Sequence, residues 1–88
     1  LVCGSLSSAT FKNCVFHDNK IQGIQGSDHA TIHIHGEATA IHTNGKGICA
    51  FFSANIVVHL PSHHNTSYNN RNEDQVTSHG GTITNVED

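Results

Sequence analysis

Residues 23–35 (GIQGSDHATIHIH) and residues 47–59 (GICAFFSANIVVH) have the same pattern at a distance of 24 positions. In this alignment Gly and Ile coincide at the start of both segments, and Ala, Ile and His coincide towards the end. Self-similarity at a fixed period of this size is typical of a solenoid, in which each repeat is one structural unit stacked on the next. The repetition therefore predicts a stack of similar coils.

Strand-like alternation fills the repeated segments. Within residues 30–36, Ile32 and Ile34 fall on one face of the expected strand. His33 and His35 fall on the opposite face. No window of the chain has the apolar period of an amphipathic helix, and Gly or Asn interrupts every candidate. The chain is therefore predicted to be all-β. Similar strand-containing units are expected at residues 8–19, 53–60 and 80–86.

A second repetition marks a corner of the expected coils. Residues 16–19 lie 25 positions before residues 41–44, and Asn69 lies a further 25 positions along the chain. Asn19, Asn44 and Asn69 are therefore predicted to occupy the same corner of three successive coils. Asparagine tolerates left-handed backbone angles, and stacked side-chain amides can hydrogen-bond along a column.

Residues 8–19 (SATFKNCVFHDN), together with the asparagine corner, resemble the coils of right-handed parallel β-helices of the pectin-lyase-like kind. The resemblance covers most of the chain and implies a right-handed parallel β-helix, or β-solenoid, of about three to four coils. Asparagine ladders at a turn are a known device of such proteins. The expected core stack consists of Phe11, Ile32, Ile56 and Ile83, with Phe11 below the three isoleucines.

The whole chain, residues 1–88, is predicted to be a single β-helix module in which residues 61–74 form a polar loop. Pro61 ends the strand before this loop because it has no N–H to give to a sheet ladder. The chain begins at Leu1 without a signal-peptide pattern, which favours a processed product or a fragment of a longer chain. Neither end resembles a cap, so the expected stack is uncapped. Either the coils continue in a longer chain, or the open ends pair with other copies and grow head to tail into a filament.

The small number of cationic side chains limits the classes of partner. Only 4 of the 88 residues are Lys or Arg, which is too few for the basic patch that nucleic-acid binding normally needs. No apolar run approaches the roughly 18–20 residues of a membrane-spanning helix. Neither a nucleic-acid partner nor a membrane span is therefore expected.

The three cysteines of the chain allow two interpretations. Cys3, Cys14 and Cys49 lack the CxxC spacing of a metal knuckle. They are interpreted either as buried thiols in a β core or as one disulfide with a third cysteine left over.

Asn65 begins an Asn-Thr-Ser triplet, the acceptor pattern for N-glycosylation, and is therefore a candidate glycosylation site. This pattern predicts a secreted or cell-surface location.

Histidine is over-represented, with 9 copies in 88 residues. His33 and His35 share an outward face, and His59 is expected to stack directly on His35 in the next coil. Three imidazoles within reach of one another could hold Zn²⁺ or Cu²⁺, and the pair His63-His64 could add a fourth ligand. The alternative is that outward His and Thr side chains only solvate a half-exposed sheet. Apart from such a divalent metal, no cofactor is expected.

Carboxylates fall in expected turns or at the end of the chain, so none forms the strand pair that a glycoside hydrolase needs. Arg71 with Glu73 and Asp74 is the best candidate catalytic cluster, and the alternative for it is a solvated loop. The chain is therefore not predicted to be an enzyme. Its predicted function is that of a structural extracellular β-solenoid module whose partners are copies of itself, stacked end to end. The alternative is a fragment of a carbohydrate-active or carbohydrate-binding β-helix protein, with a polysaccharide as its partner.

Overall fold

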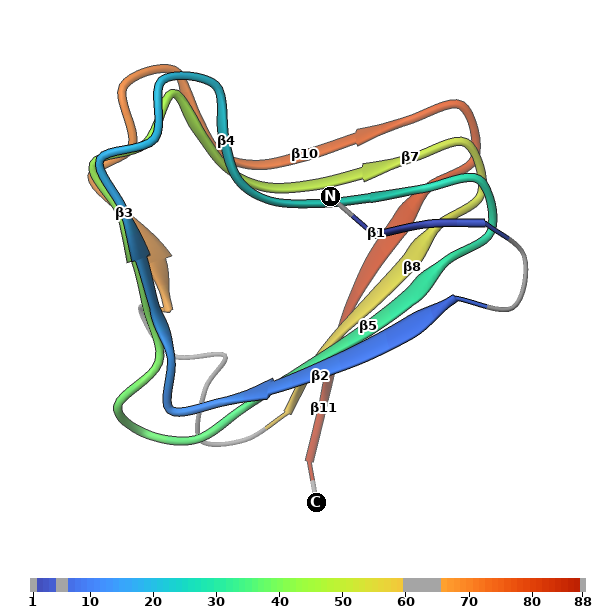
Figure 1. Cartoon of the computed structure of the whole chain (residues 1–88), viewed down its shortest axis with the longest axis horizontal. Coiled ribbons are helices and arrows are strands. Elements are labelled where there is room, and N and C mark those ends of the chain that lie inside the picture. Colours follow the sequence, from blue (N-terminus) through green and yellow to red (C-terminus); the bar gives the residue numbers. More distant parts are fainter. Residues whose placement is uncertain (1, 5–6, 60–65, 88) are drawn as a thin grey trace.

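The computed structural model describes residues 2–4, 7–59 and 66–87 (Figure 1). These residues form β-strands and contain no helix, as the sequence pattern predicts. Accordingly, this part of the chain has no helix that could cross a membrane. The candidate glycosylation site Asn65 lies outside the described residues, as do His63 and His64.

The strands are short and belong to three sheets, each built from parallel pairs. Sheet A has the order β1-β4-β7-β10, sheet B the order β2-β5-β8-β11, and sheet C the order β3-β6-β9. The bounds in chain order are β1 (Val2–Cys3), β2 (Ser8–Lys12), β3 (Val15–His17), β4 (Gln22–Ser27), β5 (Thr31–His35), β6 (Ala40–His42), β7 (Lys46–Phe51), β8 (Asn55–His59), β9 (Ser67–Tyr68), β10 (Glu73–Ser78) and β11 (Thr82–Val86).

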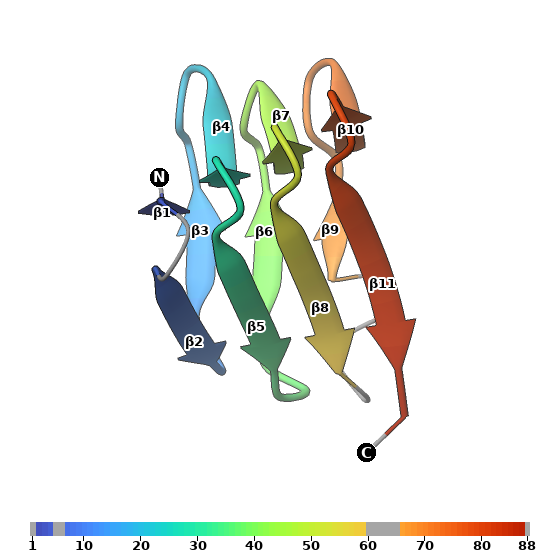
Figure 2. The same cartoon turned by 90° about the vertical axis from the view of Figure 1, so that its right-hand side faces the viewer.

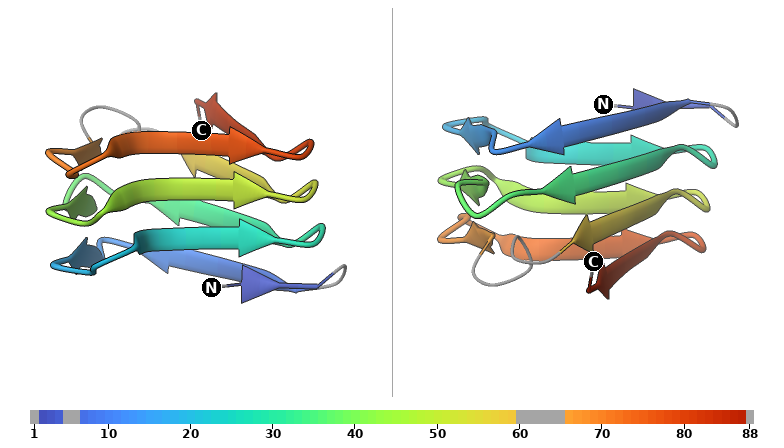
Figure 3. Two further views of the ribbon diagram at one scale, coloured as in Figure 1. Left: turned by 90° about the horizontal axis from the view of Figure 1, so that it is seen from above. Right: turned by 90° about the horizontal axis from the view of Figure 1, so that it is seen from below.

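The chain visits the three sheets in rotation, so each circuit adds one strand to each sheet. Figure 1 looks along the stack and shows the circuits superposed around a common interior. Figures 2 and 3 show the same circuits from the side as successive layers, with the first strands at one end and the last strands at the other. The stack measures 30 × 28 × 16 Å, with its axis along the shortest dimension. This arrangement is compatible with the predicted solenoid.

Strand register follows the 24-residue echo of the sequence. Ile24 pairs with Ile48 in sheet A, and Ile32 pairs with Ile56 in sheet B. Because paired residues of parallel strands point to the same side of a sheet, equivalent side chains of successive circuits lie in columns. The two similar segments are therefore direct neighbours in the stack.

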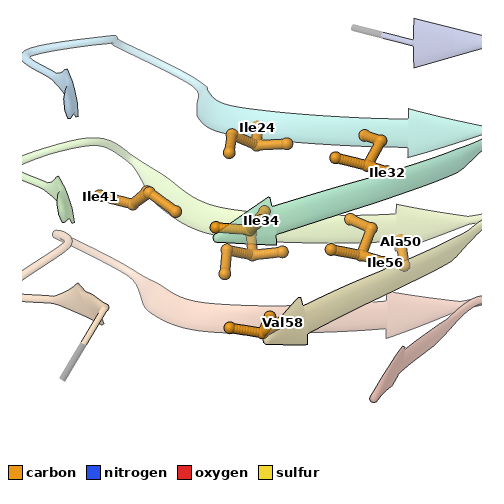
Figure 4. Packing of buried hydrophobic residues seen from close by; sticks show 8 residues of the cluster. Ile24, Ile32, Ile34, Ile41, Ala50, Ile56 and Val58 are labelled. Carbon is orange, nitrogen blue, oxygen red and sulfur yellow. The ribbon is translucent and has the colours of Figure 1, made fainter. Parts of the chain in front are cut away.

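Branched aliphatic side chains fill the interior between the sheets (Figure 4). Ile32, Ile34, Ile41 and Ile56 are completely buried, and burying a side chain of this size contributes about 1.5–3 kcal/mol. The hydrophobic interior is therefore concentrated in the middle circuits. The buried hydrophobic cluster consists of Ile24, Ile32, Ile34, Ile41, Ile48, Ala50, Ile56 and Val58.

One member of the predicted core stack occupies a different column. Ile32, Ile56 and Ile83 are aligned in sheet B, as expected from the pattern. Phe11, however, pairs with Ile34, and Ala9 lies beside Ile32. The predicted placement of Phe11 below Ile32 is therefore wrong by two residues along the strand. A slip of two residues keeps every side chain on its own face, so the alternating pattern alone does not detect it.

The predicted polar loop at residues 61–74 is interrupted by strands. Within its described part, Ser67–Tyr68 form β9, and Glu73 and Asp74 are the first residues of β10. These pairings keep the polar stretch in sheets C and A.

Candidate functional site

Three histidines converge on the outer face of sheet B, where β5 and β8 lie side by side. His33 and His35 are two residues apart on β5, so the strand period of two places them on the same face. The His35 ring stacks on that of His59, with centroids 3.9 Å apart and an angle of 12° between the planes. The prediction that His59 lies over His35 therefore agrees with the geometry.

A closer contact joins His59 to the other histidine of β5. His33 Nδ1 lies 2.9 Å from His59 Nε2, a hydrogen-bonding distance at which one ring nitrogen donates and the other accepts. All three residues are half-buried, and their ligand atoms lie within 4.8 Å of one another. The diagonal contact is not evident from the sequence, because alternation gives the face of a residue but not the direction of its ring.

The nitrogen atoms lie within 4.8 Å of one another, close enough to share one ion if one ring turns. Zinc binds imidazole nitrogen at about 2.0–2.1 Å, so two nitrogens on one tetrahedral ion are about 3.4 Å apart. Within the described residues, this is the only group of three or more His, Cys, Asp or Glu side chains whose ligand atoms come so close together. The charged neighbour in the same strand register is Lys12, which pairs with His35 on the side away from β8.

A second column of rings, on sheet C, differs from this cluster. His42 lies between His17 and Tyr68, with centroids 5.4 Å from each. The Nδ1 atoms of the two histidines contact the Asp18 carboxylate and the Thr43 hydroxyl, each on the following residue. This column is therefore a stack of rings whose nitrogens are directed to local partners.

The asparagine corner is a ladder of hydrogen bonds through the interior of the turn. Asn44 is completely buried, and its Oδ1 accepts from both the backbone and the side-chain amide of Asn19, at 3.1 and 2.8 Å. Its Nδ2 donates to Asn70 Oδ1 at 3.0 Å and to the carbonyl of Phe16 at 3.0 Å. The ladder therefore joins three successive circuits.

The third rung of this ladder is Asn70, so the predicted rung Asn69 is wrong by one residue. His17 pairs with His42 at an offset of 25, but His42 pairs with Tyr68 at an offset of 26. The third circuit thus has one more residue before its corner, which moves Asn69 to the position of Thr43. Both residues have left-handed backbones, with φ of 51° and 57°.

Arg71 and Asp74, part of the candidate catalytic cluster, are engaged in holding the turn. The Arg71 guanidinium donates to the carbonyls of Asn19 and Lys20, at 3.3 and 2.8 Å, and so reaches back across the stack. Asp74 Oδ1 accepts from the backbone and side-chain amides of Asn70, at 3.1 and 2.9 Å. These contacts give the two charged residues a structural role.

The three cysteines are free thiols in three different environments. Cys3 is exposed, Cys14 is half-buried and Cys49 is buried, so the expectation of buried thiols fits only Cys49 fully. A hydrogen bond from Cys3 to the Asp28 carboxylate raises the pKa of that thiol. Burial raises the pKa of the Cys49 thiol above its ordinary value of 9.0.

The raised pKa of Cys49 predicts a loss of stability at alkaline pH. The unfolded chain releases the thiol proton at a lower pH than the folded chain, so the contribution of Cys49 is complete below the ordinary thiol pKa. It falls as pH rises from there through the folded-state pKa. Urea unfolding at about pH 7.5 and about pH 10 should therefore show a smaller alkaline loss in Cys49→Ala than in the parent chain. Equal losses in the two chains would contradict this.

Comparison with protein-family models, curated proteins and solved structures found no match to this chain. Its function is therefore inferred from its own residues and their geometry.

Proposed function

We propose that the chain is a structural module of a secreted or cell-surface protein, built as a right-handed parallel β-helix that stacks end to end. The parallel sheets and the asparagine ladder support this proposal, because both are typical features of the family that the sequence resembles. The location depends on the sequence around Asn65 alone. The proposed partners are further copies of the same chain.

Open strand edges at the two ends of the stack carry the proposal. In the described residues β2 and β11 are the outer strands of sheet B, and each pairs on one side only. The same holds for β1 and β10 in sheet A and for β3 and β9 in sheet C. A row of unpaired backbone groups is a template for pairing with another strand. When the end of one copy meets the opposite end of the next, the contact is heterologous and extends into a filament unless it closes.

The two ends present different side chains to a neighbouring copy. Phe11 and Phe16 pack against the buried cluster from one end, where they are only half-buried. At the other end Asn85 pairs with the buried Val58 and is exposed. A copy stacked head to tail would cover both surfaces. The main-chain hydrogen bonds of six outer strands would therefore supply much of the contact, with Phe11 and Phe16 providing its apolar part.

A lysine at the interior edge of β11 should prevent this assembly. The side chain at position 85 lies on the same side of sheet B as Val58, so in a stacked copy it would enter the interior. Asn85→Lys should therefore remain monomeric, because burying an unpaired ammonium is strongly unfavourable. The matched control is Thr84→Lys, since Thr84 pairs with Val57 on the opposite face. This control should assemble like the parent chain.

Sedimentation velocity over a range of concentrations, followed by electron microscopy, tests the proposal. The expected result is a concentration-dependent increase in mass and filaments with an axial repeat of about 14–19 Å, which is three to four strand spacings. A parent chain that sediments as a monomer at all concentrations would refute it. Equal assembly of Asn85→Lys and Thr84→Lys would also refute it.

The alternative of a carbohydrate-binding module has less support. Sugars stack on the exposed faces of aromatic rings, but in the column on sheet C both faces of His42 are covered by His17 and Tyr68.

A further inference from the structure

We propose that His33, His35 and His59 bind one Zn²⁺ ion through three imidazole nitrogens, with water in the fourth position. The ion would join β5 to β8 across two successive circuits. This site is independent of the stacking of copies, because its three residues come from the two central strands of sheet B.

Convergence of the nitrogen atoms is the observation that carries this proposal. Two ligands two residues apart on one strand, with a third on the adjacent strand, bring three imidazole nitrogens within 4.8 Å of one another above the sheet. The contact of 2.9 Å between His33 Nδ1 and His59 Nε2 shows that these nitrogens face each other. An ion between them would replace one hydrogen bond by two metal–nitrogen bonds.

Binding requires one ring to turn. A metal ion lies in the plane of each imidazole that coordinates it, whereas the rings of His35 and His59 are nearly parallel and 3.9 Å apart. An ion in the plane of one ring would therefore lie well outside the plane of the other. His35 must rotate about its side-chain torsions to direct a nitrogen towards the ion. His35 lies on the face of sheet B opposite the buried cluster, so its side chain turns outside the hydrophobic interior.

The chemistry of the ligands favours zinc over harder cations. Three neutral imidazoles suit Zn²⁺, Cu²⁺ and Ni²⁺, whereas Ca²⁺ and Mg²⁺ prefer oxygen ligands. A tetrahedral site with three histidines and one open position is a common arrangement for zinc. The three histidines are half-buried on the outer face of sheet B, and no cavity was found over the described residues. We therefore infer that it binds an ion and assign it no catalytic role.

Stabilisation should accompany binding, since a ligand that binds only the folded chain raises its stability by mass action. The measurement is isothermal titration of ZnCl₂ into the metal-free chain near neutral pH, together with thermal unfolding with and without zinc. We expect one zinc ion per chain and a higher melting temperature with zinc. Threonine suits a half-buried strand position, so His33→Thr and His59→Thr should fold and bind zinc at least about 10-fold more weakly.

Two controls separate this site from other histidines. His17→Thr/His42→Thr removes a pair that stacks on neighbouring strands without converging, and it should leave zinc affinity unchanged. His63→Asn/His64→Asn removes an adjacent pair that could itself bind metal, and it should retain the tight site. Loss of tight binding in either control, or equal zinc affinity of His59→Thr and the parent chain, would overturn the proposal.

Cobalt provides a measurement that does not depend on the folding of variants. Co²⁺ in a four-coordinate site has intense visible absorption, whereas six-coordinate Co²⁺ absorbs weakly. The parent chain with one equivalent of Co²⁺ should therefore show the intense bands, and added Zn²⁺ should abolish them. A weak, six-coordinate spectrum from the parent chain would overturn the proposal.

Discussion

Replacement of Asn44 by alanine should destabilise the chain by about 3–5 kcal/mol, enough to leave it largely unfolded. The substitution removes an amide that bonds to both neighbouring circuits at once. It leaves the carbonyl of Phe16 and the backbone N–H of Asn19 without this partner, at a part-buried position. Each buried polar group that loses its partner costs about 1–3 kcal/mol. Far-ultraviolet circular dichroism and urea unfolding measure the loss.

A control at the adjacent residue tests the assignment of the ladder. Asn69→Gly keeps the left-handed backbone at an exposed position and should change stability by less than about 0.5 kcal/mol. Asn70→Ala removes the third rung and should be clearly destabilising. If Asn69→Gly were as damaging as Asn70→Ala, the corner would have the register expected from the sequence, and the ladder described above would be wrong.

Replacement of Gly47 by alanine should destabilise the chain by about 3 kcal/mol, through overpacking against the next circuit. A Cβ atom at this position would lie 2.6 Å from Asn70 Nδ2 and would also collide with the Ser67 hydroxyl and the Asp74 carbonyl. Real Cβ atoms essentially never come this close to another heavy atom. The alanine would therefore push both the third rung of the ladder and β10 away from β7. Urea unfolding gives the change in free energy.

Gly26→Ala is the matched control for this overpacking. Gly26 also lies in sheet A, but a Cβ atom there would meet only side-chain carbons, at 3.3 Å and beyond. At this distance the neighbours need to shift by only a few tenths of an ångström, so the loss should be less than about 1 kcal/mol. A smaller effect of Gly47→Ala than of Gly26→Ala would show that the ladder does not press against β7.

The crowding at Gly47 explains why the sequence echo begins with glycine. Gly23 has the same relation to Asn44, whose Nδ2 would lie 2.7 Å from a Cβ atom at position 23. In each case the asparagine of the following circuit packs onto the glycine. Each glycine and the asparagine that packs onto it therefore form one structural unit. In the sequence they belong to two separate repeats, the 24-residue echo and the asparagine corner.

The length of the repeat and the face of the sheet on which each side chain lies could be predicted from the sequence. The first depends on the spacing of similar segments, and the second on alternation along a strand. The alignment of Ile32 with Ile56, and of His35 with His59, required only the 24-residue spacing and the strand period. The exact residue at a corner depends on how many residues the chain uses between sheets, and this number varies from circuit to circuit. For this reason Phe11 was misplaced by two residues and the third rung of the ladder by one.

Ring orientation in the histidine cluster could not be predicted, because it depends on side-chain torsions and on neighbouring strands. The sequence predicts that His33, His35 and His59 share a face. It also predicts that His59 stacks on His35, but it does not predict that His33 bonds diagonally to His59. Likewise, the charged residues Arg71 and Asp74 resemble a catalytic cluster in sequence, but their hydrogen bonds in the folded chain hold the turn.

Nuclear magnetic resonance detection of couplings across hydrogen bonds tests the stacking of circuits most directly. The amide of Asn55 donates to the carbonyl of Ala30, and the amide of Thr82 donates to that of Ala54, each at 2.9 Å. The stacked arrangement predicts one correlation from Asn55 to Ala30 and one from Thr82 to Ala54. Correlation of the Asn55 amide with any other carbonyl, or rapid solvent exchange of both amides, would contradict it.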